Sequence, residues 1–368
     1  MPTPSISLVM PNHNHARYLP RSIGAVLSQT RASDQILILD DASTDESVAV
    51  IGRLTAGASN VTLMRNPERQ GVLISLNKAL AQATGDFVAF PSADDMVLPT
   101  FLEKAEALMR RYPEAAFCCA RAVLVDDQEA TIGERPLILP RMEQGYVPPE
   151  KARKLLESGD NFFLGAVTLY RRDRLMALGG FDESLGPTSD GVMQRRLAVR
   201  HGFCFIPEVL GYWRIDGHNY SVTNNTDPIR LQTNLDRARA VLAQEPKGLF
   251  PDGYADKLES RLRFGAARLL LLSPDFTPEH ASRLAALARA HPSEARAVDF
   301  LMKAPAIGRT LVLAWLALSL HPFSPRRSQP MSSPSSANSS APIAPSVTAT
   351  TATAIAVADM VGTGVFTS

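Results

Sequence analysis

The chain has 368 residues and a formal net charge of +1, with 38 Lys and Arg residues against 37 Asp and Glu residues. This balance argues against a nucleic-acid-binding protein, which would carry a basic excess, and the length suits one large domain or two smaller ones. The three cysteines, Cys118, Cys119 and Cys204, are too few for a disulfide framework and lack the spacing of a zinc site, so we expect buried free thiols.

Up to about residue 221, short apolar runs alternate with helical patterns, which is typical of an α/β fold with a mostly parallel sheet flanked by helices. The N-terminal residues carry no basic segment and the first apolar run is too short for an export signal, so we expect a cytoplasmic protein. In chain order, the expected strands are 6–10 (stopped by Pro11), 35–39, 61–64 and 87–90. The expected helices are 18–27, one capped by Ser43 or Thr44 with Asp45 and Glu46 in its first turn, 73–83, 98–111, and 171–178 before a Gly179-Gly180 turn.

Beyond the α/β part, the composition predicts three further segments. The expected divisions are an α/β domain at 1–222, a helical extension at 223–303, an apolar helix at 304–322 and a low-complexity, disordered tail at 323–368. The apolar helix contains Trp315 and is too short to span a bilayer. It is either a buried helix or a site of peripheral contact with a membrane surface.

Two pairs of carboxylates follow the second and fourth expected strands. These are Asp40 with Asp41 and Asp94 with Asp95, and open α/β sheets bind their ligands at such strand ends. Because adjacent carboxylates repel each other unless a cation or a set of donors holds them, the second pair predicts a divalent cation shared with a phosphorylated ligand. The first pair has an alternative role, since Asp is also a preferred helix cap.

Two further features carry titratable groups. Asp190 stands near the start of a helical pattern, where it is either an acid favoured by the helix dipole or a general base for an acceptor hydroxyl. The segment 212–221 reads as a polar, aromatic-rich loop after a strand, and its His218 is either a hydrogen-bonded surface residue or a ligand.

Taken in order, five stretches of this sequence resemble family-2 glycosyltransferases of the glycosyltransferase A fold. They are ISLVMPNHNHARYL at 6–19, ILILDDASTD at 36–45, the segment 71–95, GGFDE at 179–183, and Ser189-Asp190. The resemblance covers about 6–221 and implies a Rossmann-like catalytic domain at 1–222.

The resemblance implies roles for the residues that bind the donor. Pro11 and His13 would line the nucleotide-sugar pocket, and Asp41 would bind the base with Asp40 beside it. Asp94 would bind both the nucleotide sugar and a divalent cation, Mn²⁺ or Mg²⁺, that bridges the diphosphate. The wider set of candidate metal ligands is Asp94, Asp95, Asp216 and His218.

On the acceptor side, the resemblance implies a turn at Gly180, Phe181 and Asp182 and a catalytic base at Asp190. Two departures from the family pattern bear on activity: Ser92 stands where the family usually has an acid, and Ser189 replaces the usual Glu. A hydroxyl is a poorer metal ligand than a carboxylate, so we expect a lower metal affinity.

The function implied is that of an inverting, metal-dependent glycosyltransferase. It would move a sugar from a nucleoside-diphosphate sugar, with UDP favoured, to a hydroxyl of a glycan or lipid-linked acceptor in surface polysaccharide synthesis. The expected location is the cytoplasm at the inner face of the membrane, with the Trp315 segment near a lipid-linked acceptor.

Three other classes of protein are weighed against this one. A nucleotidyltransferase would show a Gly-rich, basic phosphate loop after its first strand, and a dehydrogenase would show Gly-x-Gly-x-x-Gly there; this sequence has neither at that place. A non-catalytic nucleotide- or glycan-binding relative is the third, because a fold does not fix a function. Loss of Asp190 separates it from an enzyme, since a binding protein would tolerate that loss.

Overall fold

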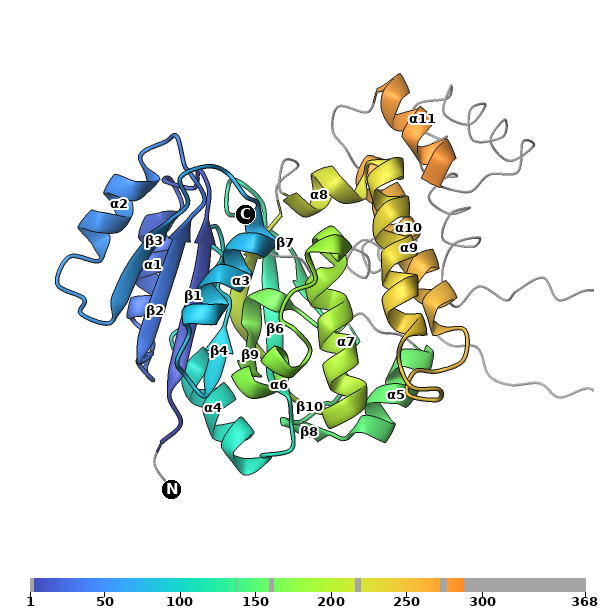
Figure 1. The fold of residues 1–368 in the computed structure, drawn as a ribbon, viewed down its shortest axis with the longest axis horizontal. Coiled ribbons are helices and arrows are strands. Elements are labelled where there is room, and N and C mark those ends of the chain that lie inside the picture. The colour runs from blue at the N-terminus through green and yellow to red at the C-terminus, as the bar shows by residue number, and fades with distance from the viewer. Residues whose placement is uncertain (1–2, 137, 159–161, 216–219, 272–276, 288–368) are drawn as a thin grey trace, which may run out of the picture.

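The computed structural model describes residues 3–136, 138–158, 162–215, 220–271 and 277–287. In this part of the chain, ten strands form one sheet in the order β3-β2-β1-β4-β9-β6-β10-β5, with β7 paired to β6 and β8 paired to β10 (Figure 1). The sheet is mixed and mostly parallel in its N-terminal half, where β3, β2, β1 and β4 all run in the same direction. The α/β prediction is confirmed.

The N-terminal strands lie close to their expected positions. Their bounds are β1 Ile6–Asn12, β2 Gln35–Asp40, β3 Val61–Arg65 and β4 Phe87–Ala89. The other strands are β5 Met96–Val97, β6 Phe117–Val125, β7 Thr131–Arg135, β8 Gly145–Val147, β9 Thr168–Arg171 and β10 Phe203–Arg214. β9 runs antiparallel between β4 and β6, whereas β6 and β10 are parallel to each other.

Side-chain alternation along the strands divides the apolar residues between two cores, one on each face of the sheet. Leu8 and Met10 of β1 face one core, and Val9 between them faces the other. Residues from α1 Leu19–Leu27, α2 Ser47–Leu54 and α4 Phe101–Arg111 complete the first core. The second core takes residues from α3 Val72–Gln82, α5 Pro149–Ser158, α6 Arg172–Ala177 and α7 Ser189–His201; α3 and α7 lie on the near face in Figure 1.

After β10 the described elements are all helices. They are α8 Tyr220–Asn225, α9 Pro228–Ala243, α10 Tyr254–Leu271 and α11 Pro278–Leu287. Leu231 of α9 and Leu262 of α10 join the same core as Leu197 of α7, so these helices pack onto the second face of the sheet. Two short 3₁₀ segments, η1 Gly165–Val167 and η2 Glu183–Thr188, precede β9 and α7.

The predictions for the chain as a whole concern the cysteines, possible membrane spans and the C-terminal segments. The three cysteines are free and buried, as expected. Among the described residues, no helix is long and apolar enough to cross a membrane. The predicted apolar helix at 304–322 and the predicted tail at 323–368 lie outside the described residues.

Two local predictions were wrong. β1 continues through Pro11 to Asn12 instead of stopping at the proline; β4 pairs only with residues 6–8, so Pro11 has a single neighbouring strand, as a proline in a sheet requires. The predicted loop at 212–221 is also incorrect at both ends, because Tyr212 belongs to β10 and Tyr220 begins α8.

The predicted cap of the second helix was wrong as well. α2 begins at Ser47, after both Asp45 and Glu46, and Glu46 is its N-cap residue with no side-chain capping bond. Ser43 instead donates its hydroxyl to Asp40 at 2.5 Å. A nearby carboxylate therefore takes the hydroxyl that local sequence assigns to the helix.

Candidate active site

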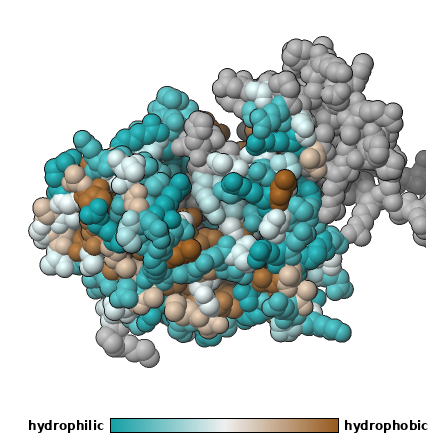
Figure 2. All heavy atoms as spheres, turned by 45° about the horizontal axis from the view of Figure 1, so that its top comes forward, coloured by the Kyte–Doolittle hydropathy of each residue, from teal (hydrophilic) through white to brown (hydrophobic). Residues whose placement is uncertain are grey.

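Parallel strands bring their carboxyl ends to one edge of the sheet, at the top of Figure 1, and two pockets lie along it. Seen with this edge turned forward, the surface is mainly hydrophilic with scattered hydrophobic residues (Figure 2). The first pocket has a volume of about 40 Å³. Its lining residues are Pro11, Asn12, His13, Asp41, Arg69, Gly71, Val72, Ser75 and Tyr220. The structure thus brings together Pro11, His13 and Asp41, three residues predicted to bind the nucleotide.

Asp40 and Asp41 take different partners because consecutive residues at a strand end point in opposite directions. Asp40 accepts hydrogen bonds from the amide of Asn12 at 2.7 Å and from Ser43, so it joins the end of β1 to the loop after β2. His13 Nδ1 lies 2.8 Å from the backbone oxygen of Asp41. Asp40 therefore supports the pocket without lining it, whereas Asp41 lines it.

Asp41 anchors the start of α3. Its carboxylate accepts from the side-chain amide of Asn66 at 2.7 Å and from the backbone N–H groups of Gln70 at 2.9 Å and Gly71 at 2.7 Å. Burial pushes the pKa of Asp41 upward, but these hydrogen bonds outweigh it and hold the pKa below its ordinary value. Asp41 does not cap the helix that follows it, because the N-cap residue of α2 is Glu46; it holds the two residues that precede α3.

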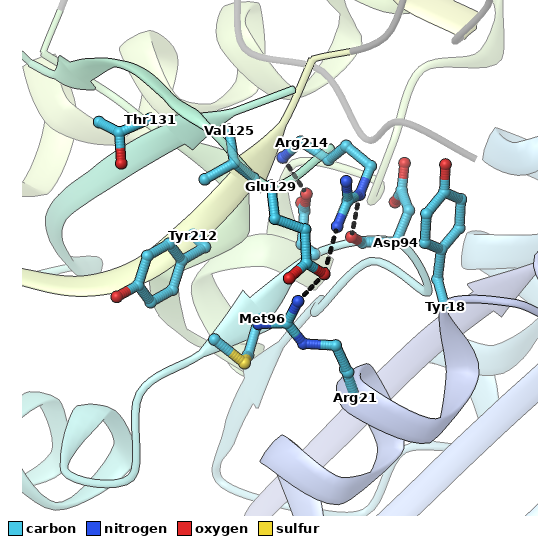
Figure 3. Close-up of a pocket in the computed structure, with 10 residues that line it drawn as sticks. Tyr18, Arg21, Asp94, Met96, Val125, Glu129, Thr131, Tyr212 and Arg214 are labelled. Atoms are coloured by element: carbon cyan, nitrogen blue, oxygen red, sulfur yellow. Dashed lines mark hydrogen bonds and ion pairs between the residues drawn. The ribbon is translucent and has the colours of Figure 1, made fainter. Parts of the chain in front are cut away.

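The second pocket lies around Asp94 and has a volume of about 330 Å³ (Figure 3). Its lining residues are Tyr18, Arg21, Asp94, Asp95, Met96, Val125, Glu129, Thr131, Tyr212 and Arg214. They come from the N-terminal end of α1, the segment after β4, the β6–β7 hairpin and the end of β10. Asp94 and Asp95 are both buried, so the predicted carboxylate pair lines a pocket next to the predicted nucleotide residues.

Arg214 is the buried cation of this pocket. Its guanidinium donates to the backbone oxygen of Asp94 at 3.3 Å and to that of Asp126 at 2.6 Å, and it lies 3.5 Å from the carboxylate of Glu129. Its own backbone N–H donates to Asp95 at 2.9 Å. One residue at the end of β10 therefore fixes the acid pair relative to the β6–β7 hairpin.

Asp94 and Asp95 supply the one or two carboxylates that a divalent cation shared with a substrate would need. Burial and then the neighbouring Asp94 charge raise the pKa of Asp95 well above its ordinary value. The two buried carboxylates therefore disfavour each other's ionised form unless a cation or hydrogen-bond donors compensate the charge. Within the described ranges, no group of three or more His, Cys, Asp or Glu side chains could hold a metal ion. Magnesium often uses only one or two carboxylates and completes its shell with substrate phosphates and water. Asp216 and His218, also predicted as ligands, lie outside the described residues.

Asp190 is the second residue of α7 and is fully buried, with 1% of its surface exposed. Burial raises its pKa to about 8, against the opposing effects of the Gly191 N–H and the Arg195 charge. Its Oδ1 accepts from the Gly191 N–H at 2.6 Å, whereas Oδ2 has no hydrogen-bond partner among the described residues. Asp190 lines neither of the two pockets. Because its pKa is raised to about 8, the carboxyl group of Asp190 holds a proton near neutral pH.

The predicted acceptor-side turn lies between α6 and η2. Gly180 has a positive φ of 75°, Phe181 is buried, and Asp182 accepts from the N–H of Ser184 at 2.9 Å. The side-chain amide of Asn77 on α3 binds the backbone of Phe181. The turn is therefore held against α3.

Sequence reasoning missed Arg21, Glu129 and Arg214 as residues of the site. One signal could have found Arg214: a buried pair of acids needs a buried cation or donor, and Arg214 stands at the end of a long apolar strand. No local signal identifies Glu129 or Arg21. They meet only because the β6–β7 hairpin folds back over α1, where the two side chains form an ion pair.

Comparison with known proteins finds similarity to one family of enzymes. Residues 7–179 match the family model described as glycosyl transferase family 2. An uncharacterized glycosyltransferase of Nostoc sp. is 29% identical over 217 residues, which are 58% of this chain and 66% of that protein. Escherichia coli WfgD, a UDP-Glc:alpha-D-GlcNAc-diphosphoundecaprenol beta-1,3-glucosyltransferase, is 33% identical over 104 residues, 28% of this chain and 40% of that protein. The chain spans less than two thirds of both relatives.

Solved structures share the fold. S. aureus TarS in complex with UDP-GlcNAc superimposes with a TM-score of 0.58 at 15% identity, covering 86% of this chain and 90% of that one. The mannosyltransferase PcManGT from Pyrobaculum calidifontis, in complex with GDP-Man and Mn²⁺, gives a TM-score of 0.52 at 22% identity over 87% of this chain and 86% of that one. Residues 7–179 of this chain are thus similar to glycosyl transferase family 2, and the chain has the glycosyltransferase A fold.

Proposed function

We propose that the protein transfers a sugar from a nucleoside-diphosphate sugar to a hydroxyl group of a glycan or lipid-linked acceptor, with inversion at the anomeric carbon. The observation that carries this proposal is the pair of neighbouring pockets at one edge of the sheet. One contains Pro11, His13 and Asp41, and the other contains Asp94. A nucleoside diphosphate also has two parts, a flat base and an anionic diphosphate, and each pocket would take one of them.

The first pocket would take the base and ribose. Asp41 remains ionised at neutral pH because three donors hold its carboxylate, and it is placed at the pocket wall with His13. TarS and PcManGT, which share the fold, bind UDP-GlcNAc and GDP-Man. This supports a nucleoside-diphosphate sugar as donor, with UDP as the favoured nucleotide.

The second pocket would take the diphosphate, and Asp94 would hold a divalent cation, Mn²⁺ or Mg²⁺, beside it. When bound, such a cation neutralises negative charge on the departing nucleoside diphosphate. Arg214 holds the backbone of Asp94 in place through its hydrogen bond to the Asp94 carbonyl. Ser92 donates its hydroxyl to Asp94, so it orients this carboxylate instead of supplying a second one.

Asp190 would be the general base. A base works best when its pKa is near the working pH, and burial raises the pKa of Asp190 to about 8. In its ionised form the carboxylate would accept the proton of the acceptor hydroxyl as the oxygen attacks the sugar. The Gly180–Asp182 turn leads through η2 into α7, which carries Asp190, and this supports an acceptor-side role for that turn.

A polysaccharide acceptor is the favoured class. The name of WfgD describes a sugar added to a diphosphoundecaprenol-linked glycan, which supports surface polysaccharide synthesis at the cytoplasmic face of a membrane. Peripheral contact through the segment around Trp315 belongs to the same proposal, and that segment lies outside the described residues.

A thermal-shift titration with UDP, GDP and dTDP, each with and without Mn²⁺, tests the donor site. Stabilisation by one nucleotide only in the presence of Mn²⁺ is the expected result. A panel of sugars linked to that nucleotide, assayed for release of the nucleoside diphosphate with lipid-linked glycans as acceptors, then identifies the reaction. A folded protein that responds to no nucleotide would overturn the proposal.

A second candidate function is that of a non-catalytic nucleotide- or glycan-binding relative. The burial of Asp190, which lines neither pocket, favours this candidate. Nucleotide binding without sugar transfer, unchanged in D190N, is the result that it predicts.

A further inference from the structure

We infer that Asn77 is a positioning residue for sugar transfer, which fixes the acceptor-side turn and, through η2, the place of Asp190. This inference rests on the proposed function, because it assigns Asn77 an effect on the base of that reaction. Asn77 lies on α3, far along the sequence from Asp190, and belongs to neither pocket.

The amide of Asn77 makes two hydrogen bonds to one residue of the turn. Its Nδ2 donates to the backbone oxygen of Phe181 at 2.8 Å, and its Oδ1 accepts from the backbone N–H of Phe181 at 3.0 Å. The same Nδ2 lies 3.4 Å from a carboxylate oxygen of Glu183. A primary amide supplies the donor and the acceptor of this pair of bonds from two separate atoms, whereas an ionised carboxylate can only accept.

The neighbouring glycine is shaped to this contact. Gly180 has a φ of 75°, a conformation that residues with a side chain rarely adopt. A Cβ at Gly180 would lie 2.8 Å from Oδ1 of Asn77. The turn and the amide thus approach each other as closely as a glycine allows.

The path from the turn to Asp190 is short and well held. The ring of Phe181 packs edge-on against Phe90, with centroids 4.9 Å apart and planes at 85°. Asp182 caps η2 by accepting from Ser184, and η2 leads directly into α7, whose second residue is Asp190. η2 is kinked at Gly186, with φ 52° and ψ −137°, and a Cβ there would lie 3.0 Å from Oδ1 of Asn234 on α9. Because this bend is itself packed against α9, a displacement of Phe181 would pass through it to Asp190.

The other end of α3 is fixed at the nucleotide pocket. Asp41 accepts from the backbone N–H groups of Gln70 and Gly71 at the start of α3, and Asn77 follows within the same 11-residue helix. One rigid helix therefore sets the distance between the residues proposed to hold the base of the donor and the turn that precedes Asp190. In catalysis a misplacement of about 1 Å can cost about 100-fold in rate.

N77D is the first test, with Q82E as its matched control. Both exchange an amide for a carboxylate on α3, but Gln82 is exposed. In N77D the carboxylate can still accept from the Phe181 N–H and can no longer donate to the Phe181 oxygen. We expect kcat for sugar transfer to fall about 10- to 100-fold, with the Kd for the nucleotide with Mn²⁺ changed less than about twofold and with Q82E like the wild type.

A double-mutant cycle with D190N separates positioning from general destabilisation. If Asn77 acts through Asp190, N77D should lower the rate of wild type strongly and that of D190N little. Equal fold-losses in both backgrounds, an unchanged kcat in N77D, or no effect of D190N on the wild-type rate would each overturn the inference.

Hydrogen exchange gives a readout that needs no activity, so failure of the proposed function can be told from failure of this inference. Peptides covering 179–190 should exchange faster in N77D than in wild type, and those of α4 should not change. Unchanged exchange at 179–190 overturns the inference even in a protein that transfers no sugar.

Discussion

Asp41 accepts a hydrogen bond from the backbone N–H of Gly71 at 2.7 Å, so a carboxylate that follows β2 holds the N-cap residue of α3. The two residues lie on different sides of β3 in sequence, and their contact closes the first pocket. Residues proposed to recognise the nucleotide are thus also residues that hold the fold.

This contact predicts an acid-sensitive contribution to stability. The hydrogen bonds from Gln70, Asn66 and Gly71 lower the pKa of Asp41 despite its burial, so the folded state binds fewer protons here than the unfolded state as the pH falls below about 4. The stabilisation is present above the unfolded pKa and is lost as the pH falls through the folded value. D41N should lower the free energy of unfolding by about 1–3 kcal/mol at pH 7.

Urea denaturation of wild type, D41N and the exposed control D252N across pH 3 to 7 measures this effect. The difference between wild type and D41N should shrink in acid, while D252N follows the wild type. A difference that stays constant over this range would show that ionisation of Asp41 does not stabilise the fold.

Asp190 predicts the opposite pH dependence of stability and a specific rate profile. Because burial raises its pKa to about 8, the folded state keeps this proton between about pH 4 and pH 8 while the unfolded state loses it. Its contribution to stability therefore falls as the pH rises through this range, and D190N should abolish that dependence. The transfer rate should rise with pH through about 8 as the base ionises.

Steady-state transfer measured from pH 6 to 9 tests both parts, with denaturation run in parallel. D190N should lower kcat by about 10²- to 10⁴-fold and be at least as stable as wild type above pH 7. A D190N variant that transfers sugar at the wild-type rate would remove Asp190 from the reaction.

Asp94 is predicted to couple nucleotide binding to the divalent cation. In D94N the thermal stabilisation by UDP with Mn²⁺ should fall to the level seen with UDP alone, because the amide is a weaker and uncharged ligand. D252N serves as the control for loss of one negative charge. Retention of the Mn²⁺-dependent shift in D94N would place the metal elsewhere.

Arg214 and Arg21 both approach Glu129, yet their losses should differ. The Arg214 side chain is 6% exposed and holds the backbone of Asp94 and Asp126, whereas that of Arg21 is 51% exposed. R214A should lower the free energy of unfolding by about 2–4 kcal/mol, and R21A by less than about 1 kcal/mol. Chemical denaturation compares them; equal losses would show that the ion pairs with Glu129 dominate.

Local pattern predicted the first half of the sheet well. The alternation of Leu8, Val9 and Met10 between two cores appears in the sequence as an unbroken apolar run, which is typical of a strand covered on both faces. Local pattern does not predict the direction of a strand. β9 runs antiparallel between β4 and β6, and no periodicity within a single strand encodes the direction of its neighbours.

The sequence predicted the acidic residues of the candidate site but not the residues that hydrogen-bond to them. Asp41 and Asp94 stand at strand ends, where chemistry is expected from position alone. Their partners Gly71 and Arg214 come from distant segments. Such pairs depend on tertiary packing, so hydrogen-bond chemistry predicts that partners exist without identifying them.

The helices after β10 share one apolar core with the α/β half of the chain. Leu235 of α9 and Leu258 of α10 pack in the same cluster as Leu197 of α7. Asn234 of α9 lies so close to Gly186 of η2 that a Cβ there would come within 3.0 Å of its Oδ1. The C-terminal helices of a relative should therefore not function when they are exchanged alone. A working chimera would have to carry η2 and α7 together with these helices. Recombination with a relative should succeed upstream of the Gly180–Asp182 turn and fail at residue 222.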